Sequence, residues 1–242
     1  AIDKYICFAA CSNVLNSIRV FAADINEFRE FDLNYPIQKS ENLWENYFLG
    51  VIDQALQTKD ELVGLDLVFS SNLPIGAGLS SSAALSCGFA TLMNDYSQLH
   101  WSKKEIALKC QWTEHEYVGI KCGIMDQFAS VFGKENSALL LDCLTTEIQY
   151  YPTNFGDYSL VLFDSCVKHS LVASEYNQRR NEVKYGFDLL KKLYPNVQTF
   201  RDLRLEMIHN NEVDLSEIQK KRLQFIIKEI ERTLKAVQFL EN

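Results

Sequence analysis

Short apolar runs that favour β structure alternate with longer helical patterns in the first half of the chain. The strand-like runs are Ile2 to Cys11, NSIRVFAAD at 16–24 and Leu65 to Ser70. Between the second and third, SENLWENYFLGVIDQAL at 40–56 repeats apolar residues at helical spacing, with Ser40 as the candidate N-terminal cap. This alternation predicts mixed α and β structure.

Two further helices are predicted after the third strand. The segment from Ser80 to Tyr96 begins with small apolar side chains, as in a tightly packed helix. The capping box SKKE at 102–105 opens the next helix. We expect that helix to run to about Val118, because Gly119 and Gly123 then interrupt the pattern.

A linker divides the second half of the chain. Strands are predicted at Ser137–Cys143 and Tyr158–Ser165, and the segment between them holds Pro152 and Gly156. Both residues break regular structure, so we place a domain boundary after Thr153.

The boundary gives two predicted domains, at 1–153 and 154–242. Helices are expected in the second domain, from about Ser174 to Tyr194 and from Ser216 to Leu240. The later helix opens with its own capping box, Ser-x-x-Gln. The overall fold class is α+β.

The composition is that of a globular chain, and it limits the expected partners. Of 242 residues, 47% are hydrophobic and 23% are charged, and 24 basic against 32 acidic residues give a net charge of −8. An acidic chain is a poor electrostatic match for nucleic acid. The sequence has no run of about 18 apolar residues, the usual sign of a membrane span. We therefore expect a cytoplasmic monomer that binds neither nucleic acid nor membrane.

The seven cysteines form neither a disulfide framework nor a zinc pattern. C-x-x-C does not occur, and the cysteines at 7 and 11 lack the further ligands of a zinc site. We expect most of them to be buried thiols in a reducing compartment. They are Cys7, Cys11, Cys87, Cys110, Cys122, Cys143 and Cys166.

The segment LPIGAGLSSSAAL at 73–85 is the main candidate for chemistry. It lacks the Lys of a Walker A loop, has Ser81 where a dinucleotide fingerprint has its third Gly, and has Ser82 where a nucleophile elbow has its last Gly. Two interpretations remain. The glycines and the unpaired N–H groups of a helix start can bind phosphate, or the segment is a plain strand–turn–helix with a Ser cap.

Four segments resemble one kinase superfamily. PIGAGLSSSAA is similar to the P-x-G-x-G-L-S-S-S phosphate loop of the GHMP small-molecule kinases. WENYFLGVI at 44–52, GIMDQFAS at 123–130 and VASEYNQRRNE at 172–182 resemble the galactokinases within it. The resemblance covers nearly the whole chain. It implies the two-lobed GHMP fold, with a ribosomal-protein-S5-domain-2-like N-terminal lobe that binds ATP and a ferredoxin-like C-terminal lobe, incomplete at both ends.

The resemblance also implies a role for each matching residue. Ser82 and Glu114 would hold Mg²⁺, and Asp126 would be the catalytic carboxylate beside the anomeric hydroxyl of the sugar. Gly123 and Tyr176 would lie at the sugar. The residues implied to bind ATP are Gly76, Ala77, Gly78, Leu79, Ser80, Ser81 and Ser82 at the phosphates and Trp44 near the adenine.

These residue types suit phosphoryl transfer, but most have a plainer interpretation. Serine and glutamate oxygens suit Mg²⁺, and a carboxylate can accept or orient a hydroxyl proton. Without the resemblance, Glu114 beside His115 and Glu116 would be part of a solvated helix face, and Tyr176 an amphipathic surface position. Asp126 stands among apolar neighbours, where a carboxylate needs a partner or a function.

Two motifs of the galactokinases are missing from this sequence. The family carries an N-terminal G-E-H-T-D-Y signature, which supplies sugar-binding carboxylates and a catalytic Arg, and a late Gly-rich motif. The opening AIDKY resembles the segment after the first motif, and the final EIERTLKAVQFLEN the segment before the second. We therefore expect truncated or unobserved ends, an incomplete sugar site and an inactive isolated chain.

The implied activity is ATP-dependent phosphorylation of D-galactose to galactose 1-phosphate, the first committed step of galactose metabolism, a branch of carbohydrate metabolism. Three alternatives stay open. They are another GHMP kinase that acts on N-acetylgalactosamine, another hexose or a small alcohol; a galactose- and ATP-binding sensor without turnover; and a nucleotide-binding domain with a vestigial sugar site.

Overall fold

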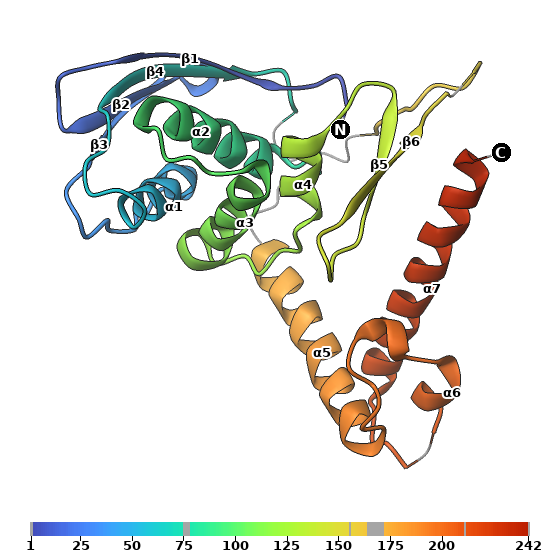
Figure 1. Ribbon diagram of the computed structural model, residues 1–242. Coiled ribbons are helices and arrows are strands. Elements are labelled where there is room, and N and C mark those ends of the chain that lie inside the picture. Colours follow the sequence, from blue (N-terminus) through green and yellow to red (C-terminus); the bar gives the residue numbers. More distant parts are fainter. Residues whose placement is uncertain (1, 75–77, 155, 164–171, 211, 242) are drawn as a thin grey trace. The chain divides into compact units, whose positions relative to one another are not determined.

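The described residues form two compact units (Figure 1). The structure is a computed structural model, and it describes the chain except for residues 1, 75–77, 155, 164–171, 211 and 242. Of the described residues, the first unit contains those up to 150 and those between 154 and 163, and the second contains 151–153 and those from 172 on. The lobe boundary that the sequence indicates, after Thr153, stays a prediction.

A four-stranded mixed sheet forms one layer of the first unit. It has the order β1-β4-β2-β3, in which β2 runs parallel to β4 and the other two pairs are antiparallel. The predicted strands at β1, β2 and β4 are confirmed. β3 was not predicted, because its sequence EFREFD has four charged residues, no β-branched residue and no apolar–polar alternation. The strands are β1 (Ile6–Ser12), β2 (Ser17–Ala22), β3 (Glu27–Asp32) and β4 (Leu65–Ser71).

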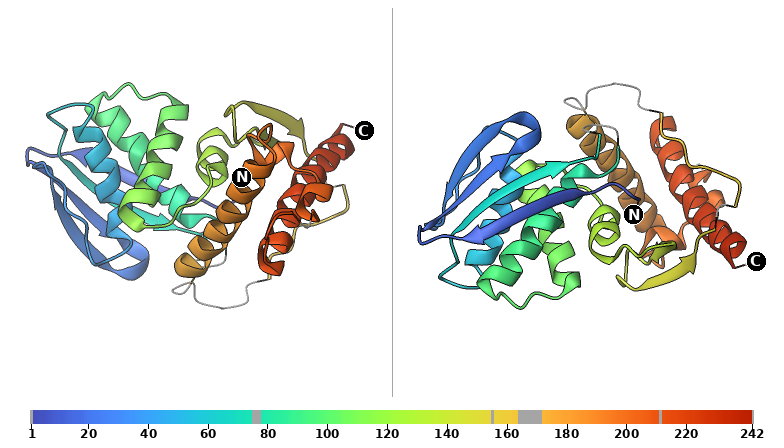
Figure 2. Two further views of the ribbon diagram at one scale, coloured as in Figure 1. Left: turned by 90° about the horizontal axis from the view of Figure 1, so that it is seen from below. Right: turned by 90° about the horizontal axis from the view of Figure 1, so that it is seen from above.

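Helices cover one face of this sheet (Figures 1 and 2). The core between the two layers centres on Phe48, which is fully buried and packs its ring on those of Phe31, Phe69 and Phe89 at centroid distances of 5.7, 5.7 and 4.6 Å. The helices of the first unit are α1 (Glu45–Leu56), α2 (Ser81–Ser97), α3 (Lys103–Thr113) and α4 (Met125–Phe132).

The helix starts test the predicted caps. The Ser102 box of α3 is confirmed, since its hydroxyl accepts from Glu105 N and the Glu105 carboxylate accepts in return. The prediction that Ser40 caps α1 was wrong. Four residues separate Ser40 from the helix, and Trp44 occupies the N-cap position. The Ser40 hydroxyl instead donates a hydrogen bond to the Glu45 carboxylate at 2.6 Å.

The helix predicted to continue to Val118 changes its hydrogen-bonding pattern on the way. After α3 ends, a π-helical turn (Glu114–Val118) completes it, and Gly119 closes that turn with φ +81°. The left-handed conformation there favours glycine. A π turn adds one residue to the helix and often marks a functional position.

A hairpin of β5 (Ser137–Leu141) and β6 (Ile148–Pro152) follows α4, of which only β5 was predicted. The strand expected at 158–165 is not present over its described part, since residues 158–163 form no regular structure and pair with no described strand. Their apolar side chains are exposed, for example Phe163 at 90%. A β-prone segment forms a strand only when a partner satisfies its backbone groups.

The second unit is mostly helical in its described part. The two predicted long helices are confirmed, and α7 opens with the expected Ser216 capping box. Leu190, Leu223 and Ile227 belong to its separate core. Its helices are α5 (Val172–Leu193), the 3₁₀ turn η4 (Phe200–Asp202), α6 (Leu205–Ile208) and α7 (Glu217–Leu240). None of the described helices is both long and apolar enough to cross a membrane.

The expectation that most cysteines are buried was wrong for the described ones. Cys87 and Cys110 are buried and Cys122 is half-buried, but the thiols of Cys7, Cys11 and Cys143 are exposed. The two exposed thiols near the N-terminus lie on β1, an edge strand. The seventh cysteine lies outside the described residues.

Candidate active site

The loop between β4 and α2 forms the expected strand–turn–helix arrangement. Gly78 has φ +74°, and a Cβ there would meet nothing within 4 Å, so the backbone on this side is open. Ser80 is the N-cap residue of α2, but its hydroxyl makes no capping bond. The plain Ser-cap interpretation therefore lacks its defining contact. Gly76 and Ala77 lie outside the described residues.

The first turn of α2 offers unpaired donors. The earliest of its helical bonds runs from Ala84 N to Ser80 O at 3.1 Å, so the N–H groups of Ser81, Ser82 and Ala83 have no partner inside the helix. These donors, with the positive end of the helix dipole, can bind an anion. Leu79 lies half-buried between Gly78 and this turn.

Ser82 and Glu114, which stand 32 positions apart, meet at this helix start. Glu114 is 4% exposed, and Gln127 Nε2 donates a hydrogen bond to its Oε1 at 2.8 Å. The side chains of Cys122 and Ser82 are close enough to act on its pKa. A solvated helix face, the plainer interpretation of Glu114, is therefore excluded. Burial, with the nearby charge of Asp126, raises the pKa of Glu114 despite the hydrogen bond from Gln127.

Tyr47 is a member of this group that the sequence did not single out. It lies on α1, and its hydroxyl is close enough to the side chain of Ser82 for the two to interact. Burial and the nearby Glu114 raise the pKa of this hydroxyl, which stays a neutral phenol. Its helical spacing with Val51 and Ala55 indicated only a core-facing position, because periodicity shows which face is inward and not what lies opposite.

Gln127 is the second member that sequence reasoning missed. Its side chain is fully buried, and Nε2 donates to Glu114 Oε1 at 2.8 Å and to Cys122 Sγ at 3.7 Å. Burial and the neighbouring Glu114 raise the pKa of the Cys122 thiol to about 12, so it stays protonated. The one available signal was the position of Gln127 directly after Asp126.

Asp126 lies half-buried in the first turn of α4. It is close enough to Glu114 and Cys122 for its charge to raise the pKa of both. Gly123 precedes it by three residues and is exposed, with nothing within 4 Å of its virtual Cβ. The structure thus brings Ser82, Glu114 and Asp126 into one cluster.

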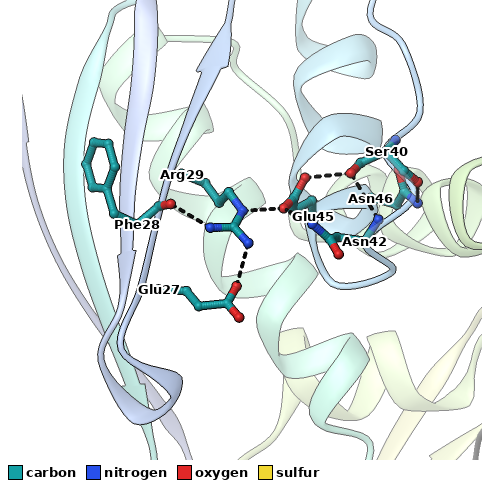
Figure 3. A network of polar contacts seen from close by, with 7 residues as sticks. All are labelled: Glu27, Phe28, Arg29, Ser40, Asn42, Glu45 and Asn46. Atoms are coloured by element: carbon teal, nitrogen blue, oxygen red, sulfur yellow. Dashed lines mark hydrogen bonds and ion pairs between the residues drawn. The ribbon is translucent and has the colours of Figure 1, made fainter.

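Trp44 packs on the hydrophobic core at the start of α1. Its ring meets Phe48 edge-on at 5.8 Å, and the Arg29 guanidinium lies 5.8 Å from its centroid. Figure 3 shows Arg29 bridging β3 to α1 by bonds to Glu27, the Phe28 carbonyl and Glu45.

Tyr176 lies on α5 in the second unit, with 40% of its surface exposed. Its implied contact with the sugar stays a prediction. His115 is structural, as its Nε2 contacts the Cys122 carbonyl at 2.9 Å.

The donor set of the cluster fits a hard divalent cation. The side chains of Ser82 and Glu114 present oxygen atoms, and Gln127 Oε1 is a buried acceptor with no hydrogen-bond partner in the described part of the chain. Within the described ranges, three or more His, Cys, Asp or Glu side chains nowhere gather as in a closed metal site. The hydroxyl and carboxylate oxygens of Ser82 and Glu114 are ligand types that suit Mg²⁺, which takes few protein ligands and completes its shell with water and phosphate.

Comparisons with known proteins identify relatives of the chain. Residues 46–134 match the family model described as "GHMP kinases N terminal domain". A galactokinase from Roseiflexus sp. is 34% identical over 241 residues, covering 100% of this chain and 61% of the relative. One from Thermotoga neapolitana is 40% identical over 201 residues, covering 83% and 55%.

The comparison with solved structures also finds a galactokinase. Lactococcus lactis galactokinase complexed with galactose superimposes with a TM-score of 0.81 at 25% identity, over 99% of this chain and 62% of that one. The predicted α+β fold class is therefore confirmed. The chain spans between 55 and 62% of the lengths of these three relatives.

Proposed function

Because this chain is homologous to the galactokinases and carries a GHMP kinase N-terminal domain, we propose that it serves the ATP-dependent phosphorylation of D-galactose at its anomeric hydroxyl. One observation supports this most directly. The buried carboxyl group of Glu114 interacts with the side chain of Ser82, at the start of α2, and with the charge of Asp126. Phosphoryl transfer needs such a group of oxygens at a phosphate-binding helix start.

The residues divide the work as follows. The loop at 76–82, with Gly78 and the free N–H groups of α2, binds the nucleotide phosphates. Ser82 and Glu114 hold Mg²⁺, which neutralises phosphate charge when bound. Asp126 holds the anomeric hydroxyl in line and accepts its proton. Trp44 borders the adenine.

Gly123 and Tyr176 complete the proposed sugar contacts. Gly123 has no side chain and open space around its Cα, so a hydroxyl of the sugar can approach the backbone before Asp126. Tyr176, half-exposed on α5, offers a hydroxyl and a ring face. We also propose that the protein is a cytoplasmic monomer of galactose metabolism.

Galactose-dependent ADP release with Mg·ATP tests the assignment, with glucose and N-acetylgalactosamine in parallel. Release with galactose alone supports galactokinase, and release with another sugar moves the assignment within the superfamily. From the 242-residue chain we expect ADP binding that Mg²⁺ strengthens, without turnover. If the full-length protein binds ADP independently of galactose, a nucleotide-binding domain is favoured. If it binds galactose without turnover, a sensor is favoured. A chain that binds no ADP contradicts the proposal.

A further inference from the structure

Glu114 is a buried carboxylate without a basic partner. It is 4% exposed, and among the described residues none of the ion pairs involves it. Its closest polar contact is instead a neutral amide, with Gln127 Nε2 at 2.8 Å from Oε1. A buried charge in this state is costly unless a cation joins it.

The amide of Gln127 fixes that carboxylate without neutralising it. A Lys or Arg at the same place would cancel the negative charge, and a Glu would repel it. An amide N–H donates one hydrogen bond to Oε1 and leaves the net charge available to a metal ion. The side chain of Gln127 is itself held, because it is fully buried and also contacts Cys122 Sγ.

Gln127 carries a cost that packing alone does not explain. Its Oε1 is buried and has no hydrogen-bond partner among the described residues. An unpaired buried acceptor destabilises the folded state, and an apolar residue of the same shape would avoid this cost. What the amide supplies at this position is the hydrogen bond to the Glu114 carboxylate.

The backbone of Gln127 belongs to the helix that carries Asp126. Its carbonyl oxygen accepts a weak hydrogen bond from Cys87 Sγ of α2 at 3.9 Å, and α4 packs against both α2 and α3. The same residue therefore joins three parts of the cluster: the helix of Ser82, the π turn of Glu114 and the first turn of α4.

We propose that Gln127 is a positioning residue for the metal site: its amide orients the Glu114 carboxylate toward Ser82 and ties it to the helix of Asp126. The inference rests on the proposed function, because that function assigns Mg²⁺ to Ser82 and Glu114. Residues that orient metal ligands in this way typically change metal affinity about 10- to 100-fold when they are replaced.

The test measures Mn²⁺ binding, as a probe for Mg²⁺, by electron paramagnetic resonance on the 242-residue chain with saturating ADP. Gln127→Met removes the amide at nearly constant length, and we expect the Kd for Mn²⁺ to rise about tenfold. The Kd for ADP without metal should stay within about twofold, since an orienting role acts only through the metal. A residue that only supports the fold would instead lower the thermal midpoint and weaken both equally.

Gln111→Met is the matched control. Gln111 lies on α3, and its Nε2 donates to the Cys122 carbonyl at 3.3 Å. This variant therefore loses an amide next to the cluster without removing the hydrogen bond from Gln127 to the Glu114 carboxylate. Its Kd for Mn²⁺ should stay at the wild-type value.

Gln127→Asn provides a second variant if Gln127→Met fails to fold, because the asparagine side chain is too short for its amide to reach Glu114. In the Glu114→Gln background, Gln127→Met should have no further effect on the Kd.

The outcomes separate the two ideas. Weaker Mn²⁺ binding in the Gln127 variants, but not in Gln111→Met, supports the positioning role. Wild-type Mn²⁺ affinity in a folded Gln127 variant overturns that role and leaves the proposed function standing. If the wild-type chain binds ADP but no Mn²⁺, the metal assignment fails and the inference fails with it.

Discussion

Replacing Glu45 by Gln should destabilise the first unit and loosen the start of α1. The Glu45 side chain is only 9% exposed, and its carboxylate accepts hydrogen bonds from Arg29, Ser40 and Asn42 (Figure 3). Burial opposes ionisation of Glu45, but the three donors outweigh it and hold its pKa below the usual value. The folded state therefore favours the charged carboxylate.

The size of the effect follows from what each partner keeps. Arg29 retains its bonds to Glu27 and to the Phe28 carbonyl, both at 2.8 Å, and one third of its side chain is exposed. It can rehydrate, so the loss stays below the roughly 3–5 kcal/mol of a broken fully buried pair. Hydrogen bonds to charged groups contribute about 1.5–3 kcal/mol, and we expect a loss of about 2 kcal/mol at pH 7.

Urea unfolding followed by tryptophan fluorescence measures this change in one unit alone. All 3 tryptophans, Trp44, Trp101 and Trp112, lie in the first unit, so the signal reports that unit. Glu41→Gln, at an exposed position nearby, is the control and should stay within about 0.5 kcal/mol of wild type.

The lowered pKa of Glu45 determines how its contribution to stability changes with pH. Because the folded-state pKa of Glu45 is lowered from 4.5, its stabilising contribution is present at neutral pH and is lost as the pH falls through the folded-state value. Wild type and Glu45→Gln should therefore converge in strongly acidic solution. A variant within 0.5 kcal/mol of wild type at pH 7, or a difference that persists unchanged at acid pH, would refute the reasoning.

Three further predictions test the packing and the site. Gly50→Ala should destabilise the first unit by about 1–3 kcal/mol, because the new Cβ would lie 2.5 Å from Thr113 Cγ2. Thermal unfolding measures this change. The control Gly123→Ala, which has open space around the new Cβ, should leave the midpoint of unfolding unchanged. Asp126→Asn in the full-length protein should retain ADP binding in a calorimeter and lose most galactose phosphorylation, and a near wild-type rate would contradict the role of Asp126. Tyr47→Phe should weaken Mn²⁺ binding about 2- to 10-fold, because it removes the polar contact to Ser82, a proposed metal ligand. Unchanged Mn²⁺ binding would make Tyr47 a packing residue only.

Some elements of this fold could be predicted from local sequence signals. The capping boxes at Ser102 and Ser216 were predicted and are confirmed, because such a box closes within four residues and needs no distant partner. The strand–turn–helix around Pro74 and Gly78 was predictable for the same reason. The motifs that resemble galactokinases identified candidate site residues, but through family likeness and not through any local energetic rule.

Pairing and burial were decided by the tertiary structure. The charged segment at β3 forms a strand because β2 pairs with it, whereas the strongly apolar segment at 158–163 has no partner strand among the described residues and stays irregular. Backbone hydrogen bonds between strands depend on a neighbour that may lie far along the chain. Local β propensity therefore misjudged both segments.

The chemistry of the cluster depends on the same distinction. Glu114 stands beside two other ionisable residues on a helix, where the sequence pattern indicates a solvated face. The π turn and the packing of α2 and α4 bury it against Ser82 and Gln127 instead. The sequence determined which oxygen and amide groups were available; only the packing of the helices decided which of them meet, because burial is a property of the whole assembled core.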